Sequence, residues 1–176
     1  MGEIQSVIKV KLVVGFIFHD PKVLEAVLEN LKELYGEIDS RSDIINFSFT
    51  SYYAKEMGEE LSKSFVSFKK LINPEDIADI KIKTNEIEQK FLYKDTLQRM
   101  INIDPGYLSA ANLVLATTKN FSHRIYIGKG IYAEVTLLYR DKKFQDLEWT
   151  YPDFKSPVYK EYLMNVRSLY MKGGGF

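Results

Sequence analysis

Three segments of the chain place apolar residues three or four positions apart, and each opens with a polar residue followed by proline. The openings are Asp20-Pro21, Asn73-Pro74 and Ser156-Pro157, and Gly36 closes the first segment. Proline fits the first turn of a helix because its missing N–H would have no partner there, and the polar side chain caps neighbouring N–H groups. The pattern predicts three helices whose apolar faces pack on a sheet. We expect these residues to be buried: Val27, Leu31, Ile80, Ile87, Val166 and Leu169.

Between these helices, apolar and polar residues alternate with the period of two that is typical of strands. The first expected strand, residues 8–18, has Lys9 and Lys11 on its polar face. Further strands are expected over residues 45–50, 61–71, 97–103 and 111–118, the last with a short helix as the alternative. Asp104-Pro105-Gly106-Tyr107 is predicted to be a turn, because proline and glycine suit the backbone angles of turns.

The C-terminal half reads as β-hairpins that lead into the third helix. One hairpin is expected to turn at residues 128–130, where Lys129 lies between two glycines, and a second turn is expected at residues 141–143. Through residue 103 the predicted order is β-α-β-β-α-β, which is the order of a ferredoxin-like core. We therefore expect an α+β fold: a mainly antiparallel sheet with its helices gathered on one face, extended by C-terminal hairpins and a final helix.

Composition narrows the class of protein. Of the 176 residues, 45% are hydrophobic and 27% charged, which suits one globular domain over residues 1–172, with a flexible Gly-rich tail at 173–176. The 24 basic residues balance the 24 acidic ones, which argues against nucleic-acid binding. The absence of cysteine excludes disulfides, zinc–cysteine sites and thiol nucleophiles. The apolar run Leu12 to Phe18 is too short to span a bilayer, so we expect a soluble cytoplasmic protein without a membrane partner.

Chemically active side chains concentrate in residues 102–134. A hairpin that turns at residues 128–130 places Arg124 opposite Glu134, close enough for an ion pair. One interpretation is an anion-binding site, and the other is a solvated hairpin face whose ion pair contributes little. For the first, the candidate ligand-binding residues are Lys119, Arg124, Lys129, Tyr107 and Tyr132, and the candidate catalytic residues are His123, Glu134 and Asp104. No metal site and no cofactor are predicted.

Known phosphate-binding motifs do not fit the Gly-Lys-Gly turn. A P-loop requires glycine where this chain has His123, and serine or threonine where it has Gly130. Four segments, however, make the chain resemble a small bacterial and archaeal single-domain family of unknown function. They span Phe49–Gly58, Asp104–Leu108, Ser122–Thr136 (with the string HRIYIGKGIYAE) and Trp149–Phe154. Members of that family are sometimes loosely described as GTP-binding proteins, a description that the motif tests do not support in this chain.

Two functions from different classes remain open at this point. The first is a domain that binds a small molecule or a nucleotide phosphate, with or without catalysis. The second is a non-catalytic protein-interaction module without a small-molecule site. The expected partner is a small anionic ligand, and the sequence leaves the oligomeric state open. A convergence of the basic and acidic side chains in one concave pocket would favour the first function, and their scatter over a flat face the second.

Overall fold

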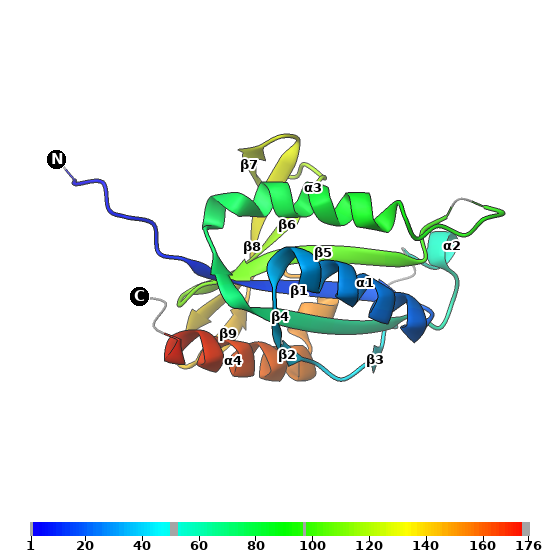
Figure 1. Cartoon of the computed structure of the whole chain (residues 1–176). Coiled ribbons are helices and arrows are strands. Elements are labelled where there is room, and N and C mark those ends of the chain that lie inside the picture. The colour runs from blue at the N-terminus through cyan, green and yellow to red at the C-terminus, as the bar shows by residue number, and fades with distance from the viewer. Residues whose placement is uncertain (1, 50–52, 97, 174–176) are drawn as a thin grey trace.

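A nine-stranded open sheet organises the computed structural model, which describes residues 2–49, 53–96 and 98–173 (Figure 1). The strand order is β2-β4-β1-β5-β6-β8-β7, with β3 paired to β4 and β9 to β8, and every strand pairing is antiparallel. The strands are β1 (Val10–Phe18), β2 (Ile38–Arg41), β3 (Ile45–Asn46), β4 (Ser62–Ile72), β5 (Ile101–Leu108), β6 (Asn112–Thr117), β7 (Ile125–Gly128), β8 (Ile131–Arg140) and β9 (Lys143–Asp146). The α+β class and the antiparallel sheet are confirmed.

The three expected helices form, and they cover both faces of the sheet. They are α1 (Pro21–Tyr35), α3 (Ile77–Glu88) and α4 (Pro157–Lys172); α2 (Ala54–Met57) is a single turn, and the 3-10 turns η1 (Pro74–Asp76) and η2 (Pro152–Lys155) precede α3 and α4. Figure 1 shows α1 and α3 on one side of the sheet and α4 on the other. The expectation that the helices gather on one face is therefore wrong. No described helix is long and apolar enough to cross a membrane.

Successive side chains of β1 point to opposite faces of the sheet, and each face has its own hydrophobic core. Leu12, Val14 and Phe16 point into the core beneath α1 and α3, whereas Val13 points into a second core under α4. Because the sheet is buried on both faces, Lys11 is buried rather than exposed, and its ammonium pairs with Asp39. Five of the six residues predicted to be buried on the helices are buried. Leu169 is the exception and is exposed.

Two predicted strands are shortened at one end in the structure. The strand over residues 45–50 shrinks to β3, because Asn46 lies opposite Ser62, the first residue of β4, and the residues after Asn46 pass the end of that strand. β2, which the pattern did not indicate, pairs with the same edge of β4. The N-terminal strand begins at Val10, and Ile8 before it is exposed. Residue 50 and the tail residues 174–176 lie outside the described part of the chain.

The predicted turn at residues 104–107 is instead the middle of β5. Asp104 lies opposite Gly15 and Pro105 opposite Val14, so this segment runs straight along β1. The N–H and C=O of Ile103 face away from β1, toward α3. Pro105, two residues further on, has the same orientation, so its missing N–H removes no hydrogen bond to β1. Packing along β1 thus overrides a local signal that is typical of turns.

β5 and β6 pair over only three residues before they separate. The pairing covers Gly106, Tyr107 and Leu108, and Pro105 and Asp104 before them are not paired with β6. At Gly106 the strands approach so closely that a β-carbon would lie 2.4 Å from the carbonyl oxygen of Val114. Glycine alone fits this contact, and beyond it the edge of β5 is open toward α3.

Replacement of Leu31 by alanine tests the assignment of the α1 face. Leu31 is fully buried in the core beneath α1, and loss of such a side chain costs about 2–5 kcal/mol of unfolding free energy. Leu34 on the same helix is 44% exposed and serves as the matched control. We expect Leu31→Ala to lower the free energy of unfolding in urea by this amount and Leu34→Ala to change it by less than about 1 kcal/mol. Equal effects of the two substitutions would contradict the assignment.

Candidate functional site

The separation of β5 from β6 opens a cavity of about 810 Å³, within the size range of small-molecule sites. Its floor is made of side chains on the α4 face of the sheet. Lys63 of β4 lies opposite Ile17 of β1, which lies opposite Asn102 of β5. Glu134 of β8, opposite Leu115 of β6, lies on the same face in the row of Gly106. Because paired residues share a face, strands far apart in the sequence place their polar side chains in one hollow.

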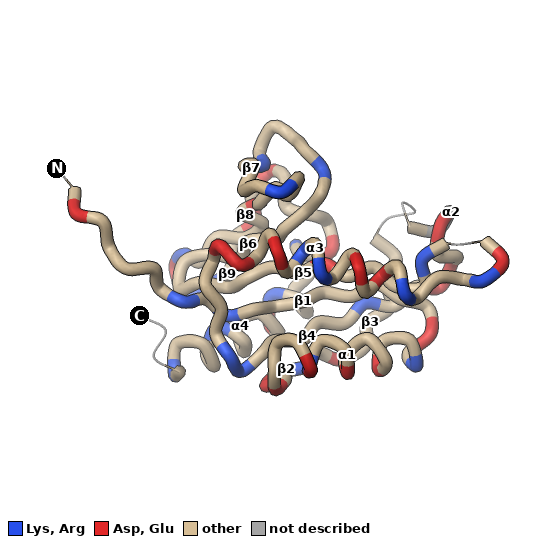
Figure 2. The backbone as a smooth tube through the Cα atoms, turned by 45° about the horizontal axis from the view of Figure 1, so that its top comes forward, with Lys and Arg blue, Asp and Glu red and all other residues tan. Residues whose placement is uncertain are grey.

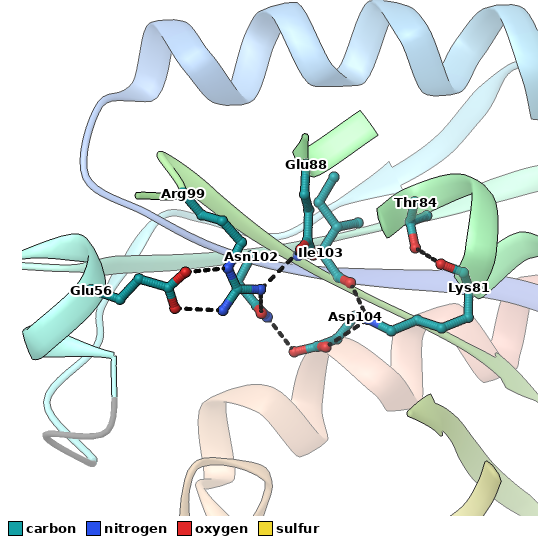
Figure 3. A network of polar contacts seen from close by, with 8 residues as sticks. All are labelled: Glu56, Lys81, Thr84, Glu88, Arg99, Asn102, Ile103 and Asp104. Atoms are coloured by element: carbon teal, nitrogen blue, oxygen red, sulfur yellow. Dashed lines mark hydrogen bonds and ion pairs between the residues drawn. The ribbon is translucent and has the colours of Figure 1, made fainter. Parts of the chain in front are cut away.

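Side chains of α3 complete the open edge of β5 in place of a neighbouring strand. Glu88 accepts the Ile103 N–H at 2.7 Å, and the Lys81 ammonium donates to the Ile103 carbonyl at 2.8 Å (Figure 3). Lys81 also pairs with Asp104 at 3.4 Å. Strand polar groups that would otherwise be buried without partners are thereby satisfied, and two charged side chains lie at the cavity wall.

Arg99 connects this edge to α2. Its guanidinium binds both carboxylate oxygens of Glu56 at 2.7 Å and also donates to Glu88 at 2.9 Å and Asn102 at 3.0 Å. Burial raises the pKa of Glu88, although Lys81 and Arg99 act in the opposite direction. The hydrogen bond from Arg99 lowers the pKa of Glu56, which is more exposed. One arginine therefore joins two carboxylates whose pKa values move in opposite directions.

Glu134 is the centre of a second polar cluster, on the opposite wall. Its carboxylate is 1% exposed and accepts from Arg124 at 2.8 Å and from His123 at 2.9 Å. The predicted Arg124–Glu134 pair is therefore confirmed, and it is buried rather than solvated. The His123 ring stacks on Trp149, with centroids 5.0 Å apart and an interplanar angle of 6°. The guanidinium of Arg124 also donates a hydrogen bond to the Tyr151 hydroxyl at 2.6 Å.

The structure separates the sequence-predicted site residues into two groups. Lys119, Arg124, Glu134 and Asp104 line the cavity, and His123 is joined to it through Glu134. The others lie elsewhere. Tyr107 packs against the core beneath α1 and α3, Tyr132 contacts Tyr126, and Lys129 forms an exposed ion pair with Asp79. Lys129 therefore points away from Arg124 even though both belong to one hairpin.

Several charged residues of the cavity were not predicted as site residues. Glu56 and Asp153 lie in segments that carry the family resemblance, whereas four others carried no signal in the sequence: Lys63, Lys81, Glu88 and Arg99. Lysines and glutamates are usually exposed, and Figure 2 shows basic and acidic positions interspersed along the chain, so their charge alone singles out none of them. The register of β4, β1 and β5 would have identified Lys63 and Asn102 as neighbours of one row. Among the described residues, no group of three His, Asp or Glu side chains converges as metal ligands would.

The opposite pKa shifts of Glu88 and Glu56 predict opposite pH effects on stability. A raised pKa in the fold means that the contribution of Glu88 to stability is lost as the pH rises. A lowered pKa means that the contribution of Glu56 is lost as the pH falls. We therefore expect Glu88→Gln to gain stability relative to wild type as the pH rises above the ordinary glutamate pKa of 4.5, and the stability deficit of Glu56→Gln to shrink as the pH falls below it.

Urea denaturation at several pH values measures both differences. The amide of Glu88→Gln can change the free energy of unfolding by an amount that does not depend on pH. This amount does not affect the test, because the prediction concerns only how the difference between variant and wild type changes with pH. Parallel pH profiles for wild type and Glu88→Gln would show that burial does not control the protonation of Glu88.

The comparisons with known proteins identify a family. A model of DUF4416, a domain of unknown function, matches residues 8–170. That range contains the whole lining of the cavity, from Ile17 to Phe154. No curated protein and no solved structure matches the chain. The resemblance to a family of unknown function is thus confirmed by a match over most of the sequence, and the chain belongs to the DUF4416 family.

Proposed function

We propose that this protein binds a small molecule with an anionic group, a phosphate or a carboxylate, in the cavity between β5 and β6. The observation that carries the proposal is the geometry of Arg124. Its side chain is 9% exposed and lines the cavity, and three acceptors hold its guanidinium in place. These are Glu134, the Lys119 carbonyl and the Tyr151 hydroxyl.

Those three bonds leave donors for a ligand. A guanidinium has five N–H groups, and the described residues accept from three of them, so two remain for an oxyanion. Burial raises the pKa of Tyr151 to about 12, so its hydroxyl keeps its proton at neutral pH. Because that oxygen already accepts from Arg124, its own hydrogen points elsewhere. Arg124 and Tyr151 both line the cavity and together carry three donor hydrogens for which the described residues supply no acceptor; charge-assisted donors of this kind bind phosphate or carboxylate.

The remainder of the lining suits an organic molecule that carries this group. Phe47, Phe49, Pro152 and Phe154 supply apolar surface, while Asn85 contributes a polar group from α3. Sites for small molecules typically combine an apolar lining with a few fixed polar groups. The basic and acidic side chains of the cavity form ion pairs with one another. These pairs fix the positions of the positive and negative groups before a ligand binds.

The fold can be assigned more finely on the same basis. We assign β1-α1-β2-β4-α3-β5 to a ferredoxin-like core, because these strands lie in the order β2-β4-β1-β5. In this assignment β6 to β9 and α4 extend the core, and the cavity lies where the extension separates from it.

The second function, a protein-interaction module, draws support from β7. Ile125, Tyr126 and Ile127 are consecutive and exposed on this edge strand. An exposed edge strand does not by itself identify a partner. The convergence of Arg124, Glu134 and Asp104 on one cavity is the concave arrangement that favours small-molecule binding.

Calorimetric titration with inorganic phosphate and with a nucleoside monophosphate tests the proposal. Tyr151→Phe removes one donor and no bulk, and Arg124→Gln removes the charge. Hydrogen bonds to charged groups contribute about 1.5–3 kcal/mol, so we expect each substitution to weaken binding about 10-fold or more.

Lys129→Gln is the matched control, since it removes a basic residue of the same hairpin outside the cavity. Its affinity should equal that of wild type. Absence of binding in wild type, or an equal loss in the Lys129 variant, would refute the anion site. If Arg124→Gln fails to fold, Tyr151→Phe decides the question.

A further inference from the structure

Lys63 lies on the cavity floor, in the row that Ile17 and Asn102 continue. Its side chain is 4% exposed and lines the cavity, so its amine faces the enclosed space rather than the bulk solvent. A lysine seldom occupies such a position, because its ammonium loses its hydration there.

Aromatic rings and one carboxylate surround the Lys63 amine. The nitrogen lies 4.6 Å from the centroid of Phe154, 5.2 Å from Phe65 and 5.4 Å from Phe47. The carboxylate of Asp153, itself buried, pairs with it. Tyr159 is 5.5 Å away at its ring centroid, and its buried hydroxyl has no hydrogen-bond partner in the described part of the chain.

Stability alone is a weak reason for this arrangement. A buried ion pair costs about as much in desolvation as it returns, and well-packed apolar residues stabilise such positions at least as well. The unpartnered Tyr159 hydroxyl adds a further cost, since a buried polar group without a partner is unfavourable. Stability therefore does not account for a lysine at this position in the cavity wall.

We propose that Lys63 forms a protonated imine with a small oxo acid bound in the cavity. The proposal rests on the proposed function, because the acid group of this ligand is the anion that Arg124 and Tyr151 bind. Nucleophilic amines that attack carbonyl groups are a recognised role of buried lysines.

The step balances without an added reactant. Asp153 takes a proton from the Lys63 ammonium, and the neutral amine attacks the carbonyl carbon to form a carbinolamine. Return of the proton to the carbinolamine oxygen releases water as the C–O bond breaks and the C=N bond forms. The products are one water molecule and an iminium ion, which carries the same positive charge as the ammonium that it replaces.

The surroundings of Lys63 suit that product. Since the charge at the nitrogen is unchanged, the iminium retains Asp153 as its counter-ion and the ring faces as its neighbours. The aromatic side chains also limit the access of water, which would hydrolyse the imine. The same residues thus stabilise the lysine before the reaction and the adduct after it.

Trapping with glyoxylate and cyanoborohydride, followed by peptide mass spectrometry, tests the proposal. Reduction converts an imine to a stable secondary amine, and the modified lysine is then identified. We expect Lys63 to be labelled faster than Lys129, although Lys129 is 60% exposed. Excess inorganic phosphate should suppress the labelling of Lys63 and leave that of Lys129 unchanged. Asp153→Asn should slow the labelling of Lys63.

The outcomes separate this proposal from the proposed function. Labelling that follows exposure, with Lys129 ahead of Lys63, refutes the imine, while Arg124-dependent phosphate binding would still support the anion site. Labelling of Lys63 that phosphate does not suppress and that Tyr151→Phe does not change supports the imine and refutes the anion site.

Discussion

The close approach of two strands at Gly106 determines where the sheet opens. A side chain at this position would collide with the backbone of β6, so the pairing of β5 and β6 depends on a residue without a β-carbon. Just before it, Asp104 and Asn102 lie on a stretch of β5 that has β1 on one side and no strand on the other. A continuous ladder between β5 and β6 would fill this space with backbone hydrogen bonds. The cavity exists because the ladder stops after three pairs.

Polar side chains replace the missing strand. The edge of β5 requires a donor and an acceptor at Ile103, and α3 supplies them through Lys81 and Glu88. The cost is the burial of charge, which Arg99 and Asp104 offset by pairing. The same charges that complete the sheet therefore make the cavity polar, so that structural and chemical roles coincide in these residues.

Local signals in the sequence predicted the parts of the structure that form locally. Asp20 caps α1 as expected, and the hairpin turn at Lys129 brings Arg124 onto Glu134. Segments whose conformation depends on distant partners were not predictable in this way. Pro105 and Gly106 have the composition of a turn, yet β1 holds them in a strand. Likewise, the floor of the candidate site depends on how distant strands pair, and no short sequence motif predicts that pairing. The wall formed by the hairpin, in contrast, comes from one continuous segment of the sequence.

The pair of Lys63 and Asp153 joins residues that are 90 positions apart. During synthesis, β4, β1 and β5 can therefore associate long before the segment that covers their α4 face emerges from the ribosome. A sheet left half covered normally exposes an apolar face that invites aggregation. Here the uncovered face carries an ammonium, an amide and a carboxylate at Lys63, Asn102 and Asp104, which water can solvate in the meantime. The polar side chains that line the cavity in the finished protein thus reduce the apolar area that this face exposes before the C-terminal helix packs on it.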